Sequence, residues 1–160
     1  MTGNRFRRLL AALALAGAAS APAAAQVGGP ADWSRLCENG RCSVSARLVA
    51  PLGASRFATV AISFDEGGGS PALSVAAPLG IAVPPGVRLL IDGETALDAP
   101  VQVCLPDGCR AGRALSTEEA EGLAAAETIE VRYFEASTGR QLAADLSTRG
   151  LARRLFEYAP

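Results

Sequence analysis

Residues 78–109 read PLGIAVPPGVRLLIDGETALDAPVQVCLPDGC and hold two strand-like runs, three turn signals and two of the four cysteines. Residues 87–91 (VRLLI) predict a mostly buried strand, and residues 101–103 (VQV) alternate as a half-buried strand does. Turns are predicted at residues 84–86 (PPG), 92–93 (DG) and 106–108 (PDG), because proline presets φ and glycine accepts a positive φ. The stretch indicates β structure and contains no recognisable reaction centre.

The same patterns continue on both sides of this stretch. Apolar and polar residues alternate over 43–50, 57–64, 128–134 and 141–146, a short strand is expected at 72–76, and Asn39-Gly40 predicts a hairpin turn. Ser116 and Glu119 form a capping box that begins a helix ending near Ala126, and a second helix is expected at 150–158. Seven to nine short strands with one or two short helices predict a single all-β domain, an antiparallel sandwich or barrel.

The first 25 residues have the pattern of an export signal rather than of a folded element. Three arginines precede an apolar run at 9–19, and residues 23–25 (AAA) form a small-x-small cleavage site. The apolar run is shorter than the roughly 20 residues that span a bilayer. We therefore expect a Sec-type signal peptide at 1–25, cleavage after Ala25, and a mature domain at 26–160 that is periplasmic or secreted and has no transmembrane segment.

Charge and composition exclude several classes of function. All 15 basic residues are arginine, and after removal of the leader 12 arginines face 16 acidic residues, a net charge of −4. This balance argues against a nucleic-acid partner, which requires a basic surface. The chain has no histidine and no lysine, which removes Ser-His-Asp and Cys-His catalysis, histidine metal sites and Schiff bases. We therefore expect no enzyme, no cofactor and no catalytic residue.

The four cysteines form two Cys-x4-Cys pairs, Cys37 with Cys42 and Cys104 with Cys109. In an exported protein an even number of cysteines indicates disulfides, whereas zinc prefers shorter spacing and redox catalysts use Cys-x-x-Cys. Four cysteines allow three connectivities; we favour the local one, because each pair brackets a turn.

Acidic residues gather at Asp92, Glu94 and Asp98, but they lack the glycine and the final glutamate of a calcium-binding loop. A solvated turn is the better interpretation, and no metal site is expected there or elsewhere.

The order of these signals resembles the invasion-associated locus B family of exported bacterial proteins. The resemblance rests on residues 78–80 (PLG), 84–87 (PPGV), 91–92 (ID) and 108–111 (GCRA), with a tryptophan ahead of the first cysteine pair and a leucine-rich tail at 142–151. Leu151 stands where the family often has phenylalanine, and residues 124–126 are alanines where it often has a glycine after the helix. Besides the cysteines, we expect four residues to matter structurally: Trp33 as a core anchor, Gly86, Asp92 and Gly108.

The resemblance implies a non-enzymatic protein with a part in host-cell contact or invasion, or in envelope stress. It would act by protein–protein contact with an unidentified partner in the envelope or on a host surface. An exposed strand edge or the loops around Asp92 and Pro106 would make the contact. A periplasmic small-molecule binding module, with its pocket in the interior or mouth of the sheet, is the alternative.

Overall fold

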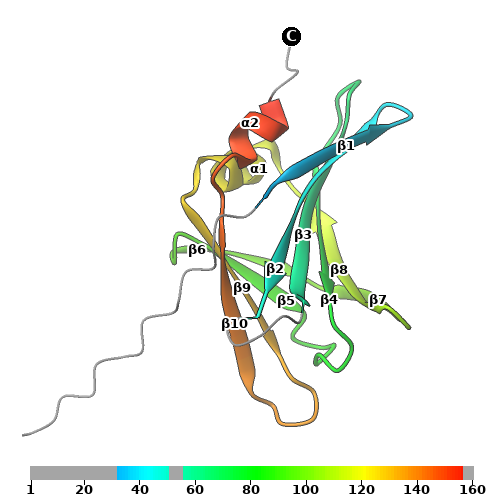
Figure 1. Cartoon of the computed structure of the whole chain (residues 1–160), viewed down its shortest axis with the longest axis vertical. Coiled ribbons are helices and arrows are strands. Elements are labelled where there is room, and N and C mark those ends of the chain that lie inside the picture. The colour runs from blue at the N-terminus through cyan, green and yellow to red at the C-terminus, as the bar shows by residue number, and fades with distance from the viewer. Residues whose placement is uncertain (1–31, 51–55, 157–160) are drawn as a thin grey trace, which may run out of the picture.

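The computed structural model describes residues 32–50 and 56–156, which form two antiparallel sheets with two short helices lying together at one end (Figure 1). The first sheet has six strands in the order β1-β2-β3-β4-β8-β7: β1 Ser34–Glu38, β2 Arg41–Val49, β3 Arg56–Asp65, β4 Ala72–Ala77, β8 Gly108–Ala114 and β7 Val101–Leu105. The second has four in the order β10-β9-β5-β6: β10 Gln141–Ser147, β9 Thr128–Phe134, β5 Val87–Ile91 and β6 Thr95–Ala99. Within the described ranges neither sheet closes on itself, so the all-β prediction is confirmed in its sandwich form.

One apolar core lies between the two sheets. The first sheet contributes side chains such as Val60 and Ile62, and the second contributes Leu89, Ile129 and Val131, all almost fully buried. Burial of every second residue, along β2 from Cys42 to Leu48 and along β3 from Ala58 to Ile62, produces this arrangement, because successive side chains of a strand point to opposite faces. Each fully buried aliphatic side chain contributes about 1.5–3 kcal/mol, so the core holds the two sheets together.

The predicted strands at 43–50, 57–64, 72–76, 87–91, 128–134 and 141–146 are confirmed within one or two residues at each end. Three further strands, β1, β6 and β8, were not expected from the sequence. The strand expected at 101–103 is confirmed as β7, but it is not half-buried, because β7 is an exposed edge strand and Val103 is 46% exposed.

The solvated-turn interpretation of Asp92, Glu94 and Asp98 is right for the first two and wrong for the third. Asp98 lies in β6 opposite Arg88 of β5, whose Nε donates to its Oδ1 at 2.6 Å. This hydrogen bond holds the pKa of the Asp98 carboxyl below its usual value. The strand was missed because residues 95–99 contain a single large apolar side chain, Leu97.

Both helices lie near their predicted positions. α1 spans Thr117–Ala125, and its capping box is formed: Glu119 N donates to Ser116 Oγ at 3.1 Å, and Ser116 N donates to Glu119 Oε2 at 2.8 Å. α2 spans Leu151–Phe156. Leu123 and Leu151 are fully buried, so the two helices cover one end of the core (Figure 1).

The expected signal peptide at 1–25 and its cleavage after Ala25 lie outside the described residues. Among the described helices, none has the length and apolar character required to cross a membrane.

Candidate functional site

Trp33 is 5% exposed and immediately precedes β1. Its indole Nε1 donates to the carbonyl oxygen of Ser147 at 2.9 Å. Since β1 is an edge strand of the first sheet and β10 an edge strand of the second, this bond joins the two sheets at one side. The structure thus places the ring in the core and not on a binding surface.

Asp92 connects the turn between β5 and β6 to the start of β9. Its Oδ1 accepts hydrogen bonds from the backbone N–H groups of Glu127 at 3.0 Å and Thr128 at 2.9 Å, and its own N–H donates to Thr128 O at 3.0 Å. The residue has a φ of 50°, a left-handed conformation that aspartate and asparagine tolerate better than most residues. The loop around Asp92 is therefore fastened to the sheet.

Gly86 and Gly108 lie where another strand comes too close for a side chain. A Cβ at Gly86 would be 2.6 Å from Ala99 O, and one at Gly108 would be 2.4 Å from Ala77 O. Both also have positive φ, 67° and 135°. At these positions both the space and the backbone conformation require glycine.

The four cysteines form the disulfides Cys37–Cys42 and Cys104–Cys109, the local connectivity of the three possible. Each joins directly opposed residues of neighbouring antiparallel strands, β1 with β2 and β7 with β8. In each pair the first cysteine is exposed and the second is almost fully buried. Spacing, register and burial therefore match between the two disulfides.

The edge strand β7 is one of the places where an interaction surface was expected. Val103 and Leu105 are 46% and 47% exposed, and the disulfide holds the strand against β8. In the following turn, Arg110 Nη2 donates to Asp107 Oδ2 at 2.5 Å. This edge therefore combines exposed aliphatic side chains with a braced backbone.

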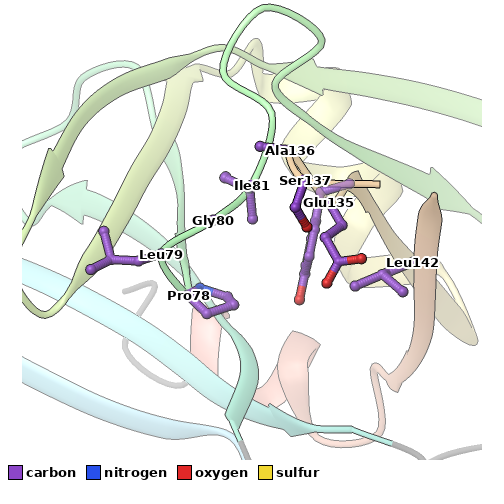
Figure 2. A pocket seen from close by; sticks show the side chains of 9 residues that line it. Pro78, Leu79, Gly80, Ile81, Glu135, Ala136, Ser137 and Leu142 are labelled. Atoms are coloured by element: carbon purple, nitrogen blue, oxygen red, sulfur yellow. The ribbon is translucent and has the colours of Figure 1, made fainter. Parts of the chain in front are cut away.

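A cleft of about 470 Å³ lies between the 78–81 loop and the β9–β10 hairpin (Figure 2). Leu79 and Ile81 line one side; Glu135, Ser137 and Leu142 line the other. The carboxylate of Glu135 accepts a hydrogen bond from Thr138 Oγ1 at 2.5 Å. The cleft is thus mostly apolar, and the carboxylate of Glu135 already has a hydrogen-bond partner within the protein.

Tyr133 also lines this cleft, with its ring 4.7 Å from that of Phe57 and its hydroxyl donating to Phe57 O at 3.2 Å. Burial, helped by the negative charge of Glu135, raises the pKa of Tyr133 to about 12. The hydroxyl therefore stays protonated at neutral pH and is unsuited to act as a general base.

A larger groove, about 620 Å³, lies between β3 and the two helices. We call it the helix-end groove. Its apolar lining includes Ile62, Phe64, Pro71, Ala120, Leu155 and Phe156, and its charged lining consists of Arg35, Asp65, Glu66 and Glu121. Its size and apolar lining with a few charged groups are typical of sites that bind organic ligands.

Arg35 and Glu66 were not singled out from the sequence, although both flank the Cys37–Cys42 disulfide. The signal was present in part, because Arg35 precedes Cys37 by two residues and residues two apart in a strand share a face. Glu66 follows β3 and reaches the disulfide only through the pairing of β2 with β3, which no local pattern reveals. In the described ranges, Cys37, Cys42 and Glu66 also form the one group with metal-ligand spacing, but both sulfurs are committed to a disulfide.

Comparison with known proteins identifies the family. A family model described as "Invasion associated locus B (IalB) protein" matches residues 31–155. Among solved structures, the chain is similar to the crystal structure of invasion associated protein B from Bartonella henselae, with a TM-score of 0.67 and 19% identity over 78% of this chain and 90% of that chain. At this identity the structural likeness shows a shared fold, and no curated protein matches the chain. Because the family model covers most of the chain, this protein belongs to the invasion-associated locus B family.

Proposed function

We propose that this chain is an exported, non-enzymatic protein that contacts a protein partner in the bacterial envelope or on a host surface. Family membership supports this proposal, as does the name of the similar Bartonella henselae protein, an invasion associated protein. The two disulfides support an oxidising compartment, periplasmic or extracellular. In this proposal residues 1–25 are removed on export and residues 26–160 form the functional domain, with a part in host-cell contact or in envelope stress.

The exposed edge of β7 is the observation that carries the proposal. An edge strand presents unpaired backbone N–H and C=O groups, and proteins usually protect such edges with charges or short strands. Here Val103 and Leu105 are about half exposed, and no charged side chain lies within residues 101–105. A partner strand that pairs with β7 would complete its hydrogen bonds and bury both aliphatic groups.

Cross-linking of the exported protein in its source cell, followed by affinity capture and mass spectrometry, tests the proposal. The parent protein should capture one dominant envelope or host-surface protein, and Val103→Lys should lose it. Val49→Lys is the matched control, because Val49 is 52% exposed but lies on β2, which β3, β4 and β8 separate from β7. Recovery of the protein alone, or equal capture by the parent and Val103→Lys, would contradict contact through β7.

The helix-end groove favours a second candidate, a periplasmic small-molecule binding module. Its volume of about 620 Å³ falls within the range of ligand pockets, roughly 300–1,000 Å³. A thermal-shift screen of organic compounds tests this candidate. A saturable rise in Tm that Phe156→Ser abolishes would favour it, and a screen with no such compound would leave protein contact as the better proposal.

A further inference from the structure

The disulfide Cys37–Cys42 lies between a cation and a carboxylate. Arg35 Nε is 3.2 Å from Cys37 Sγ, and Arg35 Nη2 is 3.3 Å from Cys42 Sγ. On the other side, Glu66 Oε1 is 3.4 Å from Cys42 Sγ. One guanidinium therefore faces both sulfurs, and one carboxylate faces the buried sulfur alone.

Arg35 is held in this position by contacts that do not involve the disulfide. Its Nη1 donates to Arg154 O at 3.1 Å, at the end of α2, and its guanidinium carbon lies 5.1 Å from the ring centre of Phe64. The guanidinium cannot rotate freely away from the sulfurs, because these contacts fix both its plane and its position.

The second disulfide lacks this environment. Cys104–Cys109 has the same spacing, the same directly opposed register and the same combination of an exposed and a buried sulfur. Among the described residues, no side chain donates a hydrogen bond to either of its sulfurs, whereas Arg35 donates to both sulfurs of the first. The protein therefore carries its own control for the effect of the flanking charges.

We propose that Cys37–Cys42 is a thiol-exchanging disulfide that forms a mixed disulfide with an external thiol through Cys37, a property beyond the non-covalent contact proposed above. An incoming aliphatic thiolate attacks the exposed Cys37 Sγ. A bond forms between these two sulfurs, the Cys37–Cys42 bond breaks, and its electron pair leaves on Cys42 Sγ. The positive charge of Arg35 stabilises the departing thiolate, and a better leaving group leaves faster.

The Glu66 carboxylate disfavours a thiolate on Cys42, which Arg35 offsets, and it acts once that sulfur is protonated. The Cys42 thiolate takes a proton from water, and the resulting thiol is within reach to donate a hydrogen bond to the Glu66 carboxylate. In the reverse direction, that carboxylate accepts the proton as Cys42 attacks Cys37 Sγ and releases the external thiolate. If the external molecule is a dithiol, its second thiolate attacks its own sulfur in the mixed disulfide. Two electrons then pass to the protein, and Cys37 is left as a thiolate beside Arg35 Nε.

The helix-end groove supplies a place for the thiol-bearing molecule, because Arg35 and Glu66 belong to its lining. Phe156, 52% exposed at the end of the groove, offers an apolar contact for a neighbouring side chain. The shared chemistry is an aliphatic thiol, which a small tripeptide thiol and a cysteine in an exposed apolar segment of a protein both provide.

The exchange is tested on the oxidised, exported protein, incubated with excess reduced glutathione at pH 7.5, quenched in acid and mapped by mass spectrometry. Cleavage after Arg41 places Cys37 and Cys42 on different peptides, so the modified sulfur is identified directly. We expect glutathione to open Cys37–Cys42 roughly tenfold faster than Cys104–Cys109, with the adduct on Cys37. Equal rates for the two disulfides, or an adduct mainly on Cys42, would overturn the proposal.

Variants separate the flanking charges from general loosening of the fold. Arg35→Gln should slow opening of Cys37–Cys42 by about tenfold and leave Cys104–Cys109 unchanged, and the matched control Arg47→Gln, an exposed arginine on β2, should change neither. Glu66→Gln should slow release of the mixed disulfide, so that the Cys37 adduct accumulates. A variant that alters both disulfides equally would report unfolding and would count against the assignment.

Two thiols distinguish the sources of the co-reactant. A short peptide with cysteine between apolar residues should react faster than glutathione, and Phe156→Ser should remove that advantage, if the natural co-reactant is a protein thiol. Equal rates for the peptide and glutathione would support a small thiol instead.

Discussion

Replacement of Asp92 should separate the hydrogen bonds of its side chain from the strain of its backbone. The carboxylate accepts two backbone hydrogen bonds, from Glu127 N at 3.0 Å and Thr128 N at 2.9 Å, while the residue holds a φ of 50°. Asp92→Asn keeps an acceptor oxygen and a residue type that tolerates this φ. Asp92→Gly removes both hydrogen bonds, but glycine adopts the positive φ without strain. Asp92→Ala removes both hydrogen bonds and also strains the backbone at this φ.

The magnitudes follow from these differences. A hydrogen bond to a charged group contributes about 1.5–3 kcal/mol when buried, and solvent exposure of Asp92 reduces the pair to about 2 kcal/mol in total. A left-handed conformation costs an ordinary residue about 1–2 kcal/mol. We expect the free energy of unfolding to fall by about 0.5–1 kcal/mol for Asn, about 2 for Gly and about 3 for Ala.

Urea unfolding of the oxidised protein, followed by tryptophan fluorescence, measures this series. The single tryptophan, Trp33, lies in the core and reports the transition. For a chain of this length the alanine variant should also melt roughly 10 °C lower. If Gly leaves the free energy of unfolding unchanged, Asp92 does not fasten β9 through its carboxylate, and if Gly and Ala are equal, the positive φ carries no strain.

Three other predictions concern packing, pH and cross-linking. Gly86→Ala should destabilise the fold by at least about 2 kcal/mol, because its Cβ would lie 2.6 Å from a carbonyl oxygen. Gly122→Ala, with open space around it, should instead stabilise helix α1 by about 0.5–1 kcal/mol. The urea midpoint should therefore fall for the first variant and rise for the second. The pKa of Tyr133 is about 12 in the folded protein, against about 10 in the unfolded chain. Its contribution to the free energy of unfolding is therefore complete below pH 10 and is lost as the pH rises to 12, because the unfolded chain releases the proton first. Tyr133→Phe should flatten that decline in urea midpoints measured from pH 8 to 12, and with no lysine and no free cysteine few other groups obscure it. Cys104→Ser should lower stability by about 1–3 kcal/mol under oxidising conditions, and an unchanged Tm would refute a stabilising role for that disulfide.

The sequence predicted those elements whose own residues select them. Every second residue is apolar and buried from Val60 to Ile62 in β3 and from Ile129 to Tyr133 in β9, and α1 begins with a capping box, so local patterns were sufficient. β8 was missed because its sequence, GCRAGRA, has no β-branched or aromatic residue. It becomes a strand because β4 and β7 pair with it on either side. Gly112 allows that pairing, since a Cβ there would lie 2.7 Å from Leu73 O.

The surroundings of the Cys37–Cys42 disulfide were less predictable, because side chains from separate elements form them. Cys-x4-Cys occurs twice and predicts the same hairpin disulfide in both places, as found. The sequence distance between Cys42 and Glu66 is 24 residues, and only the register of β2 against β3 brings them together. Spacing alone therefore predicts that a disulfide forms, whereas the groups that surround it determine how readily a thiol opens it.

The two disulfides have the same cysteine spacing, but different side chains surround them, and this difference bears on what each disulfide does. Arg35 also stabilises the fold, because it donates to Arg154 O and lies over the Phe64 ring, but its contacts with the two sulfurs add no strand pairing. At Cys104–Cys109 a disulfide that receives no side-chain hydrogen bond from the described residues holds the exposed edge of β7, where rigidity would help the proposed partner strand to pair. At Cys37–Cys42 the charges lie beside a groove and an exposed sulfur, an arrangement that fits reactivity better than stability. On the two proposals made above, the same local motif would serve contact at one edge of the sheet and exchange at the other.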